Sequence, residues 1–227
     1  MADILPDLVT LKGSKRVELR REPRSAGNFK YLTDAQIDPN DRDLLRFSNG
    51  IANMGPGPLE VGGDPSQEWR TRKGTRMMPA YQRIKQTDGT VRKIYVGPLV
   101  FDTDPDHRHW HYSGFAEYRL YDSTGLVRRS RKQAFCLIDF DQLRPGARAD
   151  YPRCSSRRMG ISPGWADTYT WELHGQEISI KNLRSGTYRL VSITNPSGRL
   201  KVRSQKGMRA SIRLRIDKAN DKVTILG

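Results

Sequence analysis

Three of the chain's four histidines occupy alternate positions, and this spacing constrains the local backbone more than any other feature. Residues 106–112 read Asp-His-Arg-His-Trp-His-Tyr, so His107, His109 and His111 are two residues apart. On a helix the middle ring would point away from the other two. On a strand all three lie on one face, and the outer two α-carbons, about 13 Å apart, allow their rings to converge on one ion if the strand bends. The spacing therefore predicts a strand and a three-imidazole metal site.

The histidine spacing does not identify the metal, because imidazole suits copper, zinc, iron and nickel alike. Three histidines with an open position on zinc would make the chain a hydrolase on a β-sandwich. A structural metal would leave a basic binding module, and an exposed strand with merely polar histidines is a further alternative. The fourth histidine, His174, is predicted to be a turn residue and not a ligand.

The charge of the chain favours anionic partners. The net charge is +15 and the pI is about 10.1, with basic residues spread from Lys12 to Lys222. No zinc-finger, RRM-like or KH-like signature accompanies this charge, so no specific nucleic-acid partner is predicted, whereas anionic envelope polymers remain candidates. No apolar run approaches 18 residues, which predicts no membrane span.

Short alternating segments with turn residues between them predict an all-β fold with a β-sandwich core. Residues 79–101 are predicted to form one hairpin around Asp88-Gly89, and residues 115–136 a second one that turns at residues 122–125. Residues 177–226 return to alternation, whereas residues 141–164 are irregular. Residues 1–30 are predicted to be a charged arm with a short strand, followed by one domain over residues 31–227.

The chain has two cysteines, Cys136 and Cys154, which enclose 17 residues. They are too few for a metal cluster and lack CxxC spacing. A loop of this length suits a single disulfide, and two buried thiols are the alternative.

The middle of the chain, from about residue 102 to residue 200, resembles the catalytic domain of the lysyl oxidases. These are copper amine oxidases that make their own quinone cofactor. Their His-x-His-Tyr/Trp-His copper motif is matched by the three alternate histidines, and their Phe-x-x-Tyr segment by residues 115–118. Residues 132–139 match Lys-x-x-Phe-Cys-Leu-x-Asp, and residues 160–169 match Gly-x-Ser-Pro-Gly-x-x-Asp-Thr-Tyr. The copper, lysine and tyrosine motifs in this order are highly specific, and the low cysteine count resembles bacterial or archaeal members.

The resemblance implies that long irregular loops carry a copper and quinone site. His107, His109 and His111 would bind copper, and Lys132 would join the oxidised ring of Tyr169 in a lysine tyrosylquinone. A primary amine, either peptidyl lysine or a small alkylamine, would be oxidised to an aldehyde with O₂, releasing H₂O₂ and ammonia.

The resemblance leaves the catalytic base open. Asp167 is the favoured candidate, Asp104 and Asp106 are alternatives, and a turn-capping role for Asp167 is also open. The family partners of the two cysteines are absent here, so these cysteines are expected to pair with each other. A secreted or extracellular location is expected, with the signal removed from this chain.

Overall fold

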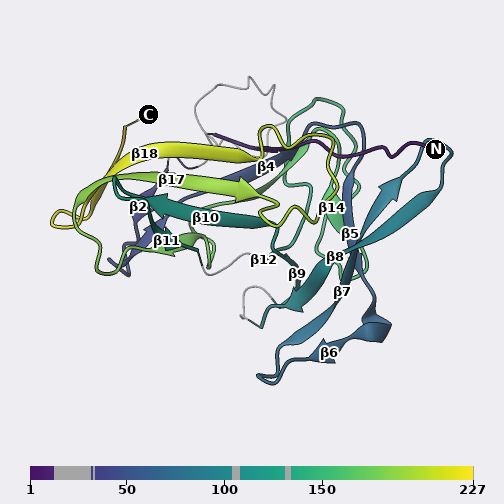
Figure 1. Cartoon of the computed structure of the whole chain (residues 1–227), viewed down its shortest axis with the longest axis horizontal. Helices are drawn as coiled ribbons and strands as arrows, with labels where there is room; N and C mark the ends of the chain where they lie inside the picture. The colour runs from purple at the N-terminus through teal and green to yellow at the C-terminus, as the bar shows by residue number, and fades with distance from the viewer. Residues whose placement is uncertain (13–31, 33, 104–107, 131–133, 227) are drawn as a thin grey trace.

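The computed structural model describes residues 1–12, 32, 34–103, 108–130 and 134–226, and these residues form antiparallel β-sheets (Figure 1). The one helical element among them is the short 3-10 helix η1 (Pro65–Gln67). The predicted all-β fold is confirmed. No helix in the described part of the chain is long and apolar enough to cross a membrane.

A five-stranded sheet forms the most regular part of the molecule. Its order is β11-β10-β17-β18-β19, with bounds Leu126–Arg129, Ala116–Tyr121, Gly186–Thr194, Arg209–Asp217 and Lys222–Ile225. On β18 the buried residues Ala210, Ile212, Leu214 and Ile216 alternate with exposed arginines. Each fully buried Leu or Ile stabilises the fold by about 1.5–3 kcal/mol, so this alternation fixes which face packs inward.

A four-stranded sheet packs against the five-stranded one. Its order is β1-β4-β15-β13, with bounds Leu8–Thr10, Asn49–Asn53, Trp165–Tyr169 and Asp141–Gln142. The Oγ1 atoms of Thr10 and Thr194 lie 2.8 Å apart, and Ser192 Oγ donates to Asn49 Oδ1 at 2.7 Å. These buried polar contacts tie the two layers together, and Tyr169 is the last residue of β15.

A seven-stranded sheet makes up the other end of the molecule. Its order is β12-β9-β8-β7-β5-β14, with β6 added on β7. The bounds are Ala134–Phe135, Trp110–Ser113, Val91–Phe101, Arg76–Lys85, Leu59–Gly63 and Met159–Ile161, and Trp69–Arg70 for β6. A small third layer has the order β16-β3-β2, with bounds Glu177–Ser179, Leu44–Arg46 and Gln36–Ile37.

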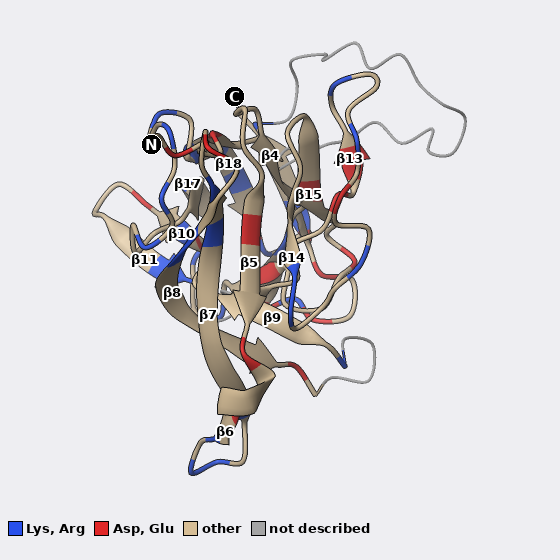
Figure 2. Ribbon diagram, turned by 90° about the vertical axis from the view of Figure 1, so that its right-hand side faces the viewer, with Lys and Arg blue, Asp and Glu red and all other residues tan. Residues whose placement is uncertain are grey.

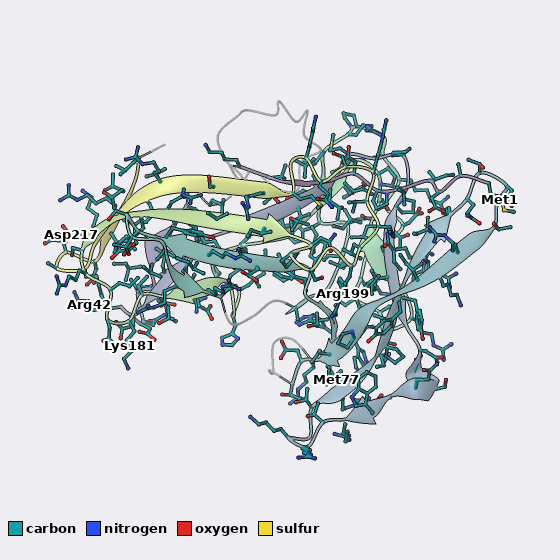
Figure 3. The ribbon with its side chains drawn as sticks, in the orientation of Figure 1. Met1, Arg42, Met77, Lys181, Arg199 and Asp217 are labelled. Carbon is teal, nitrogen blue, oxygen red and sulfur yellow. A yellow bond between two sulfur atoms is a disulfide. The ribbon has the colours of Figure 1, made fainter. Side chains whose placement is uncertain are left out.

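Both predicted hairpins are present. Strands β7 and β8 form the first, and Gly89 in its turn has a φ of +85°, which glycine adopts without strain. Strands β10 and β11 form the second. The register of β7 and β8 shifts near Gly97, whose φ is +119° and where an added Cβ would lie 2.9 Å from Nη1 of Arg199. Arg199 therefore fills the space over this irregularity, at the junction of the sheets (Figure 3).

The histidine strand is shorter than predicted. Strand β9 begins at Trp110 because Phe101, the last residue of β8, pairs with it. His111 thus lies in the strand and His109 just before it, while His107 lies outside the described residues. Most of the predicted N-terminal arm, residues 13–31, also lies outside them. Leu8 to Thr10 form a strand within the core, and the division at residue 30 stays a prediction.

Candidate metal and tyrosine site

His109 and His111 point their ring nitrogens at each other. Their Nε2 atoms lie 2.8 Å apart, and the ring planes are inclined by 76°. The Asp102 amide donates to the His109 carbonyl at 3.0 Å, which continues the β8–β9 pairing past the end of β9. This bond fixes the backbone of His109, so the two imidazoles converge as the sequence predicted for neighbouring histidines of the motif.

The arrangement of these two rings fits a bound metal ion. Two nitrogen ligands at 2.0–2.1 Å from one ion, about a right angle apart, are separated by about 2.9 Å. The other ring nitrogen of His111, Nδ1, lies 3.3 Å from Oδ2 of Asp102. A carboxylate in this position fixes the tautomer that leaves Nε2 free to bind metal. The third predicted ligand, His107, lies outside the described residues.

The Cys136–Cys154 disulfide lies beside His109. The two cysteines are joined, with their α-carbons 5.6 Å apart, so the predicted disulfide is confirmed and the two-thiol alternative is wrong. The sulfur atoms and a ring nitrogen of His109 lie within 4.8 Å of one another. A disulfide sulfur is not a thiolate, the form in which cysteine binds metals. The pair therefore forms a wall of the site and leaves metal binding to imidazole.

Tyr169 is held by the backbone of the same cysteine. Its hydroxyl accepts from the Cys136 N–H at 2.8 Å and donates to the Cys136 carbonyl at 2.9 Å. Its ring packs edge-on against Phe135, with centroids 4.8 Å apart. Burial, with a smaller effect of the nearby Asp167, raises the pKa of Tyr169 well above its ordinary value. Cys136 therefore connects the histidine pair to the tyrosine. The other predicted cofactor residue, Lys132, lies outside the described residues.

A tight turn sets the direction of the strand that carries Tyr169. The Trp165 N–H donates to the Ser162 carbonyl at 3.1 Å, and Gly164 has a φ of +84°. Proline followed by a glycine at positive φ is the pattern of a type II turn. The Ser-Pro-Gly part of the motif at residues 160–169 thus serves to reverse the chain between β14 and β15.

Asp139 joins the two motif segments. Its carboxylate accepts the N–H and Oγ of Ser162, both at 2.7 Å, and the N–H groups of Asp150 and Tyr151, both at 2.9 Å. Asp139 ends the motif at residues 132–139, and Ser162 lies in the motif at residues 160–169. The pairing could not be read from the sequence, because it depends on how two irregular segments fold together.

Asp167 is a buried acid whose carboxyl group has no hydrogen bond of normal geometry to any residue that the structure describes. It lies in β15 and is 2% exposed. Burial, followed by the charges of Asp139 and Asp141, raises its pKa well above the ordinary value. The alternative role as a turn cap is wrong, because Asp167 is within a strand. A buried acid with a raised pKa is a candidate for proton transfer.

Of the remaining residues considered in the sequence analysis, one is described by the structure and two are not. His174 lies in an exposed turn between β15 and β16, as predicted. Asp104 and Asp106 lie outside the described residues. Asp102 is the site residue that sequence reasoning missed as a partner of His111. Only the register of β8 against β9 brings the two together.

The fold and the site define an all-β protein with a candidate imidazole metal site next to a half-buried tyrosine. The family model of lysyl oxidase matches residues 98–224, more than half of the chain, and includes all three motifs. The chain belongs to the lysyl oxidase family.

Curated relatives match a central segment of the chain. Human lysyl oxidase homolog 1 is 36% identical over 97 residues, which cover 40% of this chain and 16% of the relative. Protein-lysine 6-oxidase of Gallus gallus is 32% identical over 99 residues, which cover 40% of this chain and 22% of the relative. The match thus spans less than a quarter of the length of either relative.

Proposed function

We propose that this protein is a copper- and quinone-dependent amine oxidase of the protein-lysine 6-oxidase type. It deaminates primary amines oxidatively, either peptidyl lysine or small alkylamines, and gives aldehydes, H₂O₂ and ammonia. The observation that carries the proposal is that Cys136 connects His109 to Tyr169. The relatives named protein-lysine 6-oxidase support the same reaction class.

The metal ligands in this proposal are His107, His109 and His111. Copper held there, with O₂, would supply the oxidising chemistry for joining Tyr169 and Lys132 in the lysine tyrosylquinone. Asp102 holds the His111 ring in the tautomer that presents Nε2. The Cys136 backbone holds the hydroxyl of the unmodified Tyr169 at one position, so the ring that would become part of the cofactor is oriented in advance.

Asp167 is the proposed catalytic base, which takes the proton from the carbon next to the amine nitrogen. A carboxylate whose pKa is raised by burial and by neighbouring acids binds a proton more readily than an exposed one. It is two residues from Tyr169 on the same strand, and alternate residues of a strand face the same side. The position of Asp167 on the strand of Tyr169 and its raised pKa both support its proposed role as the base.

A zinc hydrolase and a basic module with a structural metal are the competing functions. Neither gives a role to the half-buried Tyr169 or to its contact with Cys136. The disulfide favours an oxidising compartment, which agrees with a secreted or extracellular protein that acts on lysine-bearing protein substrates.

The test is aerobic incubation of the purified protein with copper, followed by intact mass under denaturing conditions and peptide mapping. We expect a cross-linked peptide pair containing Lys132 and Tyr169, visible absorbance, and H₂O₂ release with a simple alkylamine. Tyr169→Phe is the matched control, because it keeps the ring that packs on Phe135 and removes the hydroxyl. Separate, unmodified peptides in a fully active enzyme would contradict the proposed cofactor. Hydrolysis by a zinc-loaded form without H₂O₂ would favour the hydrolase.

A further inference from the structure

One face of the seven-stranded sheet carries positive charges directly opposite each other. Alternate residues of β7 share this face, and Arg83 pairs with Lys93 of β8 across the strands. Like charges at opposed positions destabilise a sheet. Lys85 follows Arg83 on the same face, so the repulsion extends along β7. This face therefore gathers positive charge that a bound anion would stabilise.

The same face is hollowed into a groove. A cavity of about 540 Å³ is lined by Gly62, Asp64, Tyr81, Arg83, Lys93 and Arg157 among others. A second cavity, of about 250 Å³, shares Arg83 and adds Glu60, Lys85 and Arg158. We call these two cavities together the basic groove. In Figure 2 the blue segments of β7 lie beside the red segment of β5, and blue appears again next to β14.

A buried carboxylate positions two of the arginines in the basic groove. Glu60 is 6% exposed, and its oxygens lie 2.6 Å from Nε of Arg83 and 3.0 Å from Nε of Arg158. The Tyr151 hydroxyl donates to Glu60 at 2.7 Å. Burial opposes ionisation, but Tyr151 and the two arginines lower the pKa of Glu60. The guanidinium groups are thus held in place before any ligand arrives.

The third arginine is brought in by a close backbone approach. A Cβ on Gly62 would lie 2.3 Å from the Arg157 carbonyl oxygen, so only glycine allows this contact. The Gly63 N–H donates to the Ser156 carbonyl at 2.7 Å. These contacts hold the segment before β14 against β5 and place Arg157 in the wall.

The basic groove has an excess of positive charge. Its lining contains five cations, Arg83, Lys85, Lys93, Arg157 and Arg158, and two carboxylates. Glu60 is occupied by the two arginines and Tyr151. Asp64 accepts from Ser66 and Gln67 at the start of η1. Three cations remain for which the lining has no matching carboxylate.

We propose that the basic groove binds a linear polysaccharide that carries carboxylate or sulfate groups. Arg83 and Lys85 lie about 7 Å apart along β7, and Lys93 of β8 lies opposite Arg83, which suits successive charged groups on an extended chain. Tyr95, which is 60% exposed, and Tyr81 offer aromatic surface for sugar rings at one end.

A polysaccharide fits these observations better than a nucleic acid. The disulfide favours an oxidising compartment such as the outside of the cell, which is compatible with an extracellular polymer as the ligand. Tyr81 and Tyr95 pack at 67° to each other, an edge-on pair that does not form the successive parallel platforms on which bases stack. The basic groove shares no residue with the histidine and tyrosine site, so its ligand is independent of the proposed oxidase reaction.

The test is fluorescence anisotropy with a labelled heparin hexasaccharide and a labelled polygalacturonate oligomer at several salt concentrations. The double variant Lys93→Gln/Arg157→Gln removes two exposed cations from the groove. We expect it to bind about tenfold more weakly and to reduce the slope of log Kd against log salt by about one to two. The matched control Arg213→Gln/Arg215→Gln removes the same charge from the exposed face of β18 and should change Kd less than twofold.

Equal weakening by both double variants would show a generic charge effect and overturn the proposal. Tighter binding of a single-stranded oligonucleotide of the same charge would overturn it in favour of nucleic acid. A chemical footprint on the unmodified protein gives a second readout. Saturating glycan should protect Lys85 and Lys93 from acylation and leave Lys222 reactive, whereas the opposite pattern would also overturn the proposal.

Discussion

The five-stranded sheet and the histidine and tyrosine site are held together in different ways. On β17 and β18 eight successive residue pairs are in register, and the burial of alternate side chains repeats along the strand. Around the site the strands are short, and β12 and β13 have two residues each. There the chain is held by Asp139, by the Tyr169 hydroxyl and by a disulfide. The sheet distributes its stability over many similar contacts, whereas the site depends on a few particular atoms.

The largest expected effect tests whether the histidine site is as specific as this comparison requires. His111→Ala in copper-loaded protein should lose the nitrogen-coordinated Cu(II) EPR signal and at least about a hundredfold of amine oxidation, since even changes outside the ligand shell cost 10–100-fold. His174→Ala is the matched control, because this exposed turn residue should leave both unchanged. A retained EPR signal in His111→Ala would remove this histidine from the metal site.

The second prediction compares two carboxylates that each accept several hydrogen bonds. Asp139→Ala leaves the N–H and hydroxyl of Ser162 and the N–H of Tyr151 without their acceptor, and removes one of the two acceptors of the Asp150 N–H. It should lower the free energy of unfolding by about 4 kcal/mol. Asp122→Ala removes the acceptor of Thr124 and Gly125 in the β10–β11 turn, and should cost about 1 kcal/mol. Urea unfolding measures both, and similar losses would mean that the two regions are equally robust.

The third prediction concerns the disulfide wall. Replacing Cys136 and Cys154 together by serine should lower the free energy of unfolding by about 3 kcal/mol, from the loss of loop closure in the unfolded chain. The five-stranded sheet has no such cross-link among its described residues. Hydrogen exchange should therefore rise near residues 134–169 and stay unchanged on β17 and β18. A uniform rise would show that the two regions unfold as one unit.

The smallest expected effect comes from Asp167, and its sign depends on pH. Its pKa is raised in the folded state, so the unfolded chain releases the proton first as pH increases. At pH values below the pKa that Asp167 has in the unfolded chain, the free energy of unfolding is therefore not reduced. It falls as the pH rises from that value towards the higher pKa of Asp167 in the folded protein. Asp167→Asn removes this loss and should raise Tm at pH 7 by about 2–4 °C, the shift that 1 kcal/mol gives in a domain of this size. The gain should vanish near pH 3, and a gain of equal size at both pH values would exclude the titration of Asp167 as its cause.

The proposed role of Asp167 as a base predicts that the substitution that stabilises the protein lowers its activity. If Asp167 accepts the substrate proton, Asp167→Asn should reduce kcat and abolish the rise of kcat with pH, while leaving the Cu(II) EPR signal in place. A stabilised variant with unchanged kcat would make Asp167 a structural residue only.

The regular parts of the fold could be predicted from the sequence because their cause is local. Asp88-Gly89 between two alternating segments specifies a hairpin, and the alternation on β18 specifies its buried face. The convergence of His109 and His111 also follows from local spacing. The partners of these residues do not. Asp102 reaches His111 only through the register of β8 and β9, and Asp139 reaches Ser162 only when two irregular segments meet.

The position of β15 sets an order of events during folding. Tyr169 pairs with Asn49, and Trp165 with Asn53, so the strand with the tyrosine completes a sheet begun far earlier in the chain. Forming such a pairing costs more loop-closure entropy than forming a hairpin. The β7–β8 and β10–β11 hairpins close short loops and are therefore expected to form early. During synthesis the ribosome releases His111 well before Tyr169. An ion captured by the histidines at that stage would have to wait until β15 has paired with the much earlier β4 and brought Tyr169 into place.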